Sequence, residues 1–246
     1  MNKISETAKL GDNVSVGDFS IIKDDVKIGN NVIIGNNVVI HEGTTIGDNI
    51  RIDDNTVIGK QPMKAVTSAV SDDELQPPCE IGDGCLIGAN TVIYAGCEIG
   101  SDCLVADQAS IRENVEIGEK TIIGRGVAVE NYCQIGSKCK LETNVYITAY
   151  SEVEDNCFIA PGVITSNDNF AGRSEERYDY FKGVTVKEGG RIGAGATILP
   201  GKVIEEDGFV AAGSTVTKDV PAKKIVAGTP AEIFKDVPED QLLENQ

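Results

Sequence analysis

The sequence has no tryptophan, a single histidine and few aromatic residues of any kind. Its 246 residues include six Tyr and six Phe, so aromatics make up 5% of the chain, whereas hydrophobic residues make up 41%. A wide core filled with aromatic rings is therefore excluded, and the hydrophobic content must lie in a narrow core of aliphatic side chains. One histidine also rules out a zinc site made of three histidines, and we expect no metal.

Long apolar runs and positive charge are scarce as well. The chain contains no run of about 18 apolar residues and opens on no signal-peptide pattern. The formal net charge of -17 argues against nucleic acid or an anionic membrane as the main partner. The seven cysteines form no CxxC pair, and buried free thiols suit a reducing compartment. These absences predict a cytoplasmic protein that binds neither nucleic acid nor membrane.

What the sequence does contain is an aliphatic residue at every sixth position. The spacing holds from Ile4 to Ile58, from Ile81 to Ile159 and from Val186 to Val216, which gives ten, fourteen and six hexads, or thirty in all. Gly, Asp or Asn often follows the aliphatic residue, and these residues accept the left-handed backbone of a tight corner. A period of six fits neither an amphipathic helix nor an alternating strand. It predicts an all-β fold, a parallel β-helix of about ten triangular coils.

Two segments interrupt this spacing. Ile58 and Ile81 are 23 positions apart, and Ile159 and Val186 are 27 apart; neither number is a multiple of six. We therefore expect two insertions, near 60–80 and 165–183, that leave the β-helix. The first is either a surface loop without a chemical role or a contact with substrate or a neighbouring subunit.

The second insertion gathers aromatic and basic side chains. Aromatic rings stack on nucleobases, and guanidinium groups bind phosphate oxygens through two hydrogen bonds. We therefore expect this loop to bind substrate, although packing on an adjacent subunit is an alternative role. The candidate substrate-binding residues are Arg173, Arg177, Tyr178 and Phe181.

Two hexads near the C-terminus are poor in side chains. IGAGAT (192–197) and VAAGST (210–215) place Ala194 and Ala212 eighteen residues apart, so the two alanines are expected to stack on one wall. A smooth wall with accessible backbone amides suits a long, thin ligand. Residues 182–235 carry a net charge of +2, with Lys218, Lys223 and Lys224 close in sequence, and such a patch suits the phosphates of coenzyme A.

The end of the chain predicts a helical cap. Pro230 follows Thr229 and suits the first turn of a helix, which would cover the last coil of the β-helix. The expected organisation is thus a β-helix over residues 1–228 and a short C-terminal helical region over 229–246.

The hexapeptide repeat, the loop APGVITSNDNFAGR and the closing pattern AAGSTVTKDVPAKKIVAGTPAEIF resemble the left-handed β-helix acyltransferases. Within that family the TSND loop and IGAGATILPG are most similar to nucleotide-sugar N-acetyltransferases. The resemblance implies a left-handed β-helix, a homotrimer with active sites between subunits, and acetyl-CoA as acyl donor. It also implies a nucleotide-linked amino sugar as acceptor, with a dTDP-3-amino-3,6-dideoxyhexose favoured. The cofactor-binding residues expected on this basis are Ala194, Gly195, Ala212, Gly213, Lys218, Val220, Pro221, Lys224 and Pro230.

The lone histidine bears on the reaction type. Many members of the family use a histidine as general base, but His41 lies in an early coil, where we expect it to face outward and far from the C-terminal patch. An amine with a pKa of about 8 is partly neutral at pH 7 and needs less help from a base than a hydroxyl does. The sequence therefore favours N-acylation, which depends on positioning and on stabilisation of the oxyanion by a backbone amide.

Three residues are candidates for the catalytic roles. Asp168 would bind the ammonium group and receive its proton, and Asn167 would orient the amine. Glu142 is a weaker candidate for the same chemistry. Asp168 has an alternative role as a cap for the turn of its own loop.

Two other functions remain open from the sequence. The segment GKQPMKA resembles a loop of lipid A-type UDP-sugar acyltransferases, which use acyl carrier protein, but their catalytic histidine has no counterpart in the C-terminal half. The second alternative function is a non-catalytic β-helical scaffold. Such a scaffold has no need of a bare Ala-Gly wall beside lysines.

Overall fold

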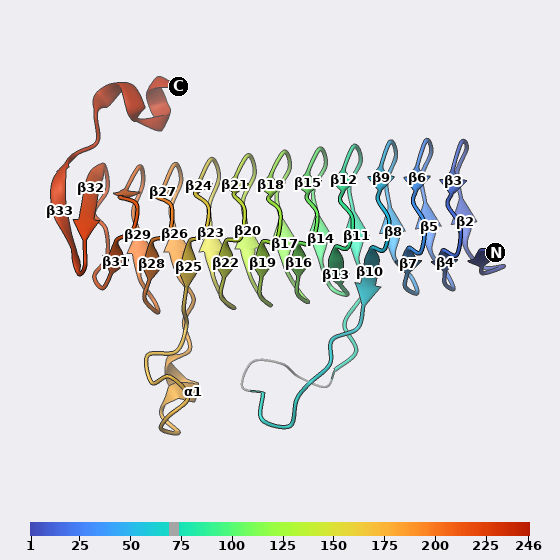
Figure 1. Ribbon diagram of the computed structural model, residues 1–246, viewed down its shortest axis with the longest axis horizontal. Coiled ribbons are helices and arrows are strands. Elements are labelled where there is room, and N and C mark those ends of the chain that lie inside the picture. Colours follow the sequence, from blue (N-terminus) through green and yellow to red (C-terminus); the bar gives the residue numbers. More distant parts are fainter. Residues whose placement is uncertain (69–73) are drawn as a thin grey trace.

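The computed structural model describes residues 1–68 and 74–246, and over these the chain forms the expected left-handed parallel β-helix. Short strands follow one another around three walls that run the length of the molecule (Figure 1). Consecutive coils pair in parallel with an 18-residue offset, for example Ile21 with Val39 and Ile22 with Ile40. This offset is the one that three hexads per coil require.

We name the walls A, B and C in chain order and name each corner by the two walls that it joins. Wall A consists of β1 (Lys3–Ile4), β4 (Ile21–Ile22), β7 (Val39–Ile40), β10 (Val57–Lys60), β13 (Val92–Tyr94), β16 (Ser110–Ile111), β19 (Ala128–Val129), β22 (Tyr146–Ile147), β25 (Ile164–Thr165), β28 (Thr197–Ile198) and β31 (Thr215–Val216). Wall B consists of β2 (Lys9–Leu10), β5 (Lys27–Ile28), β8 (Thr45–Ile46), β11 (Glu80–Ile81), β14 (Glu98–Ile99), β17 (Glu116–Ile117), β20 (Gln134–Ile135), β23 (Glu152–Val153), β26 (Thr185–Val186) and β29 (Val203–Ile204). Wall C consists of β3 (Ser15–Val16), β6 (Ile33–Ile34), β9 (Arg51–Ile52), β12 (Leu86–Ile87), β15 (Leu104–Val105), β18 (Ile122–Ile123), β21 (Lys140–Leu141), β24 (Phe158–Ile159), β27 (Arg191–Ile192), β30 (Phe209–Val210), β32 (Lys224–Gly228) and β33 (Ala231–Asp236).

The aliphatic residue of each hexad points into the prism. Ile52 and Ile93 in the middle coils are 0% exposed, whereas Ile4 in the first coil is 42% exposed because no coil covers its other side. All seven cysteines are free and buried, as expected for small side chains that fill the core. The core is therefore a narrow aliphatic column, which is why the chain needs no tryptophan.

The corners explain the Asn, Asp and Gly residues of the repeat. Asn13, Asn31 and Asn49 occupy equivalent positions of successive coils with φ of 57°, 56° and 59°. Their side-chain amides form a ladder, in which Asn13 donates to Asn31 at 3.0 Å and Asn31 donates to Asn49 at 3.1 Å. Asn tolerates the left-handed conformation better than most residues, so a sharp corner can recur in every hexad.

The predicted number of coils is slightly too low. The three walls contain 11, 10 and 12 strands, against the ten coils expected from thirty aliphatic hexads. One strand was missed because its inward residue is Thr165, which is 1% exposed and satisfies its hydroxyl by donating to the carbonyl of Tyr146. A polar residue can occupy the core when it has such a partner.

The predicted C-terminal helix is wrong. Instead, β32 and β33 form an antiparallel hairpin, and β32 pairs with β30 at the open edge of wall C. Two 3₁₀ turns, η1 (Glu239–Gln241) and η2 (Leu243–Asn245), follow. Pro238 disfavours the helical conformation at Val237, which leaves too few residues for a stable helix, and the hairpin supplies hydrogen bonds for the exposed strand edge.

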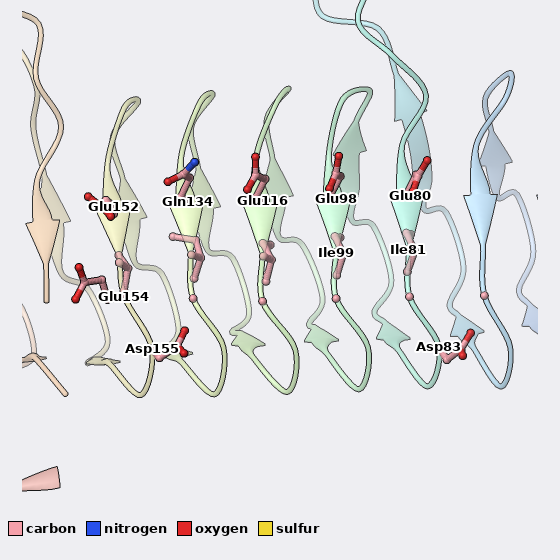
Figure 2. A pocket seen from close by; sticks show the side chains of 18 of the residues that line it. Glu80, Ile81, Asp83, Glu98, Ile99, Glu116, Gln134, Glu152, Glu154 and Asp155 are labelled. Atoms are coloured by element: carbon pink, nitrogen blue, oxygen red, sulfur yellow. The ribbon is translucent and has the colours of Figure 1, made fainter. Parts of the chain in front are cut away.

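The outward faces of the three walls differ in charge. Ten consecutive outward positions of wall A carry no charged side chain: Ile21, Val39, Val57, Val92, Ser110, Ala128, Tyr146, Ile164, Thr197 and Thr215. Wall B presents a row of acidic side chains, which Figure 2 shows on adjacent coils: Glu80, Glu98, Glu116 and Glu152, with Gln134 among them. Wall C mixes apolar residues with Arg51, Lys140 and Arg191.

Both expected insertions leave the β-helix at the AB corner. The first lies between β10 and β11, and the second lies between β25 and β26 and contains α1 (Arg177–Tyr180). They project from the same edge of the prism (Figure 1). Tyr94, between them in sequence, is held by Lys60 and Arg112, whose cationic groups lie 4.6 and 5.0 Å from the ring centroid.

Candidate functional site

The CA corner becomes bare in the last coils. Gly162, Gly195 and Gly213 follow one another along this corner with φ of 70°, 65° and 69°, and a methyl group added at any of them would meet no atom within 4 Å. Ala194 and Ala212 are exposed beside them. They stack as predicted, since the Gly213 N–H donates to the Ala194 carbonyl at 2.9 Å, but they lie at a corner and not on a wall. The result is a smooth strip that runs along the prism axis.

Backbone amides along this strip lack the side-chain caps that they have elsewhere. In an earlier coil of the same corner, the Ala89 N–H donates to the Asp107 carboxylate at 2.8 Å, and the Asp18 N–H likewise donates to Asn36 at 2.8 Å. The residue one coil beyond Ala194 is Ala212, whose methyl side chain cannot accept a hydrogen bond. The N–H of Ala194 is thus left for another acceptor, such as an amide carbonyl of a bound ligand.

The predicted lysines do not form one patch. Lys218 pairs with Glu232 of β33 at 3.2 Å, Lys224 pairs with Asp236, and Lys223 pairs with Glu244 at 3.1 Å. The acidic partners come from the C-terminal hairpin and the 3₁₀ turns, which the sequence placed in a helix.

The other residues predicted near the cofactor differ in accessibility. Val220 is 1% exposed, and its backbone is already paired, since its N–H donates to the Val203 carbonyl at 2.8 Å and its carbonyl accepts from the Glu205 N–H at 3.0 Å. Pro221 and Pro230, in contrast, are exposed.

The second insertion is organised around Asp168. Its carboxylate accepts the N–H groups of Phe170 at 2.8 Å and Gly172 at 2.9 Å, and it pairs with Arg177 at 3.3 Å. Burial opposes ionisation, but these backbone hydrogen bonds and Arg177 outweigh it and hold the pKa of Asp168 below its ordinary value. Asp168 therefore caps the turn of its own loop, the alternative that the sequence had left open.

Arg177 is also held by contacts within the same loop. Its guanidinium lies 4.9 Å from the ring centroid of Tyr178 and 5.7 Å from that of Phe181, and the two rings meet edge to face. Arg177 is thus fixed by an ion pair and two rings, whereas Arg173 is exposed to solvent. Of the two arginines, Arg173 is the one whose charge remains accessible to a phosphate.

A small pocket of about 200 Å³ lies at the AB corner beside this loop. Asn167, Asp168, Arg177 and Phe181 line one side, so the structure brings together four of the residues proposed for substrate binding and catalysis. The other side is formed by the coils beneath, through Glu130, Tyr146, Thr148 and Ala149. Sequence reasoning missed Glu130 because, as the first residue after Val129 in a polar corner, it looks like any solvated turn residue.

Glu130 differs electrostatically from Asp168. Burial raises its pKa, and the negative charge of Glu113 acts in the same direction, while Arg112 opposes both from 3.6 Å. Arg112 also pairs with Glu113, whose carboxylate is 2% exposed and accepts two hydrogen bonds from it, at 2.8 and 2.9 Å. The pocket thus contains two carboxyl groups whose pKa values are shifted in opposite directions, a feature typical of acid–base sites.

Two other candidates lie outside this pocket. Glu142 follows β21 at the CA corner, on the opposite edge of wall A from Asn167. His41 follows β7 at the AB corner in an early coil, with its side chain 20% exposed and Nδ1 3.0 Å from the Lys23 ammonium. The expectation that His41 faces outward is thus only partly met. Strand β7, which His41 follows, lies far along the prism from the second insertion (Figure 1).

A larger hollow lies along wall B, an open groove of about 810 Å³ among the described residues. Figure 2 shows that Glu80, Glu98 and Glu116 stand in line along it. A row of stacked carboxylates repels the phosphates of a nucleotide or of coenzyme A. This groove therefore does not suit the nucleotide or the coenzyme A that the sequence led us to expect.

Asp168→Asn tests the capping role. The amide keeps one acceptor oxygen but loses the charge that binds Arg177, so we expect faster hydrogen–deuterium exchange at the N–H groups of Phe170 and Gly172. Because the pKa of Asp168 is lowered by folding, the wild-type loop keeps this protection at neutral pH and loses it only as the pH falls through that lowered value. Equal exchange rates in the variant and the wild type at neutral pH would show that the carboxylate does not hold the loop.

Comparison with known proteins places the repeat in a family of transferases. A model described as bacterial transferase hexapeptide (six repeats) matches residues 7–42 and 78–113, and a model of the hexapeptide repeat of succinyl-transferase matches 25–60 and 108–149. A 2,3,4,5-tetrahydropyridine-2,6-dicarboxylate N-acetyltransferase from Clostridium perfringens is 58% identical over 48 residues, and one from Staphylococcus aureus is 47% identical over 58. These matches span 20% and 24% of both chains, so about a fifth to a quarter of each relative is covered.

A solved structure shares the fold. The UDP-N-acetylglucosamine acyltransferase of Arabidopsis matches with a TM-score of 0.68 and 20% identity, over 96% of this chain and 73% of that one. A GDP-perosamine N-acetyl transferase from Caulobacter crescentus matches at 25% identity over 55% of this chain and 57% of that one, with a TM-score of 0.47. No helix within residues 1–68 and 74–246 is long and apolar enough to span a bilayer.

Proposed function

Because this chain belongs to the hexapeptide-repeat acyltransferases, we propose that it transfers an acetyl group from acetyl-CoA to the amino group of a nucleotide-linked amino-deoxy sugar. The favoured acceptor is a dTDP-3-amino-3,6-dideoxyhexose, because the Ser166-Asn167-Asp168 segment resembles that branch of the family. The observation that carries the proposal is the bare CA corner, where Ala194 and Ala212 leave a smooth strip and an uncapped amide. A pantetheine arm is long, thin and rich in amide groups, and it suits such a strip.

The two halves of this site lie on opposite edges of wall A in one chain. The bare strip is at the CA corner, and the pocket with Asn167 and Glu130 is at the AB corner. One acetyl group cannot be bound at the first and transferred at the second without a second copy of the chain. The proposed function therefore requires an oligomer.

Wall A supplies the surface for this assembly. Its outward positions are uncharged over ten coils, and Ile164 and Tyr146 are 51% and 37% exposed in the single chain. In a cyclic trimer with wall A of each copy turned toward the axis, the CA corner of one copy meets the AB corner of the next. The acidic wall B then faces solvent, where its charges keep the assembly soluble.

The chemistry of the completed site follows from its parts. Acetyl-CoA on the strip of one copy presents its thioester to the pocket of the next, where Asn167 orients the sugar amine. The amine attacks the carbonyl carbon, and a backbone N–H near the thioester stabilises the oxyanion. Aromatic residues of the second insertion and the exposed Arg173 are the groups proposed to bind the nucleotide.

The test is release of free thiol from acetyl-CoA in the presence of a panel of amino-sugar nucleotides. We expect release with at least one dTDP-linked 3-amino sugar and none with the corresponding 3-hydroxy sugar. Absence of release with every amino sugar, from protein that is folded and binds CoA, would reject the substrate class. Transfer from acyl carrier protein but not from CoA would favour the lipid A-type alternative. No binding of either donor in a calorimetric titration would favour the scaffold.

A further inference from the structure

Resting on the proposed function, we infer that Glu130 accepts the proton of the attacking amine, while Asp168 fixes the loop that forms the pocket. Glu130 follows β19 directly, and its N–H donates to the Ile147 carbonyl of the next coil at 2.9 Å, so its backbone is held by the β-helix and not by the second insertion. Its side chain lines the same pocket as Asn167, the residue proposed to orient the amine.

Asp168 is poorly placed for proton transfer. Both of its carboxylate oxygens already accept hydrogen bonds from the loop, one from Phe170 and the other from Gly172 and Arg177. Protonation of Asp168 during turnover would break the contacts that shape the pocket. A carboxylate that holds a loop in this way is a positioning group.

Glu130 has the opposite surroundings. Its charged neighbours are Arg112 and Glu113 on the coil before it, and Tyr146 and Cys133 lie close by. Asp168 and Arg177 face the pocket from the insertion and pair with each other. Arg112 donates two hydrogen bonds to Glu113, at 2.8 and 2.9 Å, and lies 3.6 Å from Glu130, so Glu130 is held near a positive charge without being fully neutralised by it.

The step balances without an additional reactant. The amine nitrogen forms a bond to the thioester carbon, and one N–H proton moves to a carboxylate oxygen of Glu130. The C–S bond then breaks, and its electron pair leaves on the sulfur of coenzyme A. The proton on Glu130 passes to that thiolate, directly or through water, which restores the carboxylate for the next turnover.

Glu130→Gln tests this role because it keeps the size of the side chain and removes its basicity. We expect kcat to fall by about 10²- to 10⁴-fold, the usual contribution of a general base, with little change in KM. Asp168→Asn is expected to act mainly on KM for the sugar nucleotide. Glu116→Gln on the solvent face of wall B is the matched control and should behave as wild type.

The pH profile separates catalysis from a structural role. In wild type, log(kcat/KM) should rise with slope two at low pH, because both the substrate amine and Glu130 must lose a proton there. Above the raised pKa of Glu130 only the amine still has to lose a proton, so the slope should fall to one. Glu130→Gln should keep slope one throughout. Glu130→Asp, which retains a carboxylate, should regain part of the lost rate.

The outcomes are distinguishable from failure of the proposed function. If wild type releases thiol and folded Glu130→Gln matches it in rate and slope, the role of Glu130 is wrong and the transferase assignment stands. If wild type releases no thiol with any amino sugar, the transferase assignment and the role of Glu130 are both wrong. Thermal melting of each variant shows whether a lost rate reflects unfolding instead.

Discussion

Ala212→Phe is expected to abolish binding of coenzyme A while leaving the fold intact. Ala212 is exposed at the CA corner, so a ring at this position projects into the proposed path of the pantetheine arm and displaces no core side chain. We expect the affinity for CoA to fall by about two orders of magnitude or more, which corresponds to about 3 kcal/mol. Isothermal titration calorimetry of the variant and the wild type with CoA measures this directly.

Ala89→Phe is the matched control for this experiment. Ala89 occupies the same corner position in a coil near the middle of the prism, where its N–H is already bound by Asp107. We expect unchanged CoA affinity for Ala89→Phe. Loss of affinity in both variants would mean that the corner is sensitive to bulk for reasons other than the cofactor, and retention in both would place the cofactor elsewhere.

Ala128→Arg is expected to prevent assembly and thereby activity. Ala128 lies on the outward face of wall A between Ser110 and Tyr146, and in the trimer each copy would bring one unpaired charge toward the axis. Burying an unpaired charge costs about 3–5 kcal/mol, enough to dissociate a moderate interface when three copies share the penalty. Sedimentation velocity should show a monomer, with thiol release reduced at least about 100-fold because no complete site remains.

Gln134→Arg provides the comparison for the interface. Gln134 is in the strand that follows β19 and points outward from wall B, between Glu116 and Glu152. We expect this variant to remain a trimer with full activity. If Gln134→Arg dissociates the protein and Ala128→Arg does not, the assembly uses wall B, and the proposed pairing of corners is wrong.

The fold could be predicted from the sequence because most of the largest buried side chains occupy one position of the hexad. Inward residues such as Ile52 and Ile93 lie at that position, and Gly, Asn or Asp supplies the corner that follows. The pattern missed strand β25, because its inward residue is Thr165, whose hydroxyl donates to a backbone carbonyl and so can be buried without being aliphatic. The sequence also mispredicted residues 231–236 as helix. They form β33 because the exposed edge of wall C, a tertiary feature, favours a hairpin there.

The site was predictable only in part, for related reasons. Ala194 and Ala212 were found because their stacking follows directly from the repeat, and Asn167 and Asp168 were found from the break in it. Glu130 could not be found, because the sequence does not say which coils the second insertion lies against. The pairing of Lys218 with Glu232 was also hidden, since it depends on the hairpin.

Subunit complementation tests most directly whether the CA corner of one copy and the AB corner of the next form a single site. Ala212→Phe and Glu130→Gln should each be nearly inactive alone. If the two are dissociated, mixed in equal amounts and reassembled, one site in about four combines two intact corners in a cyclic trimer, and we predict about a quarter of the wild-type rate of thiol release. A mixture that stays as inactive as either variant, despite proven formation of mixed trimers, would contradict a single shared site.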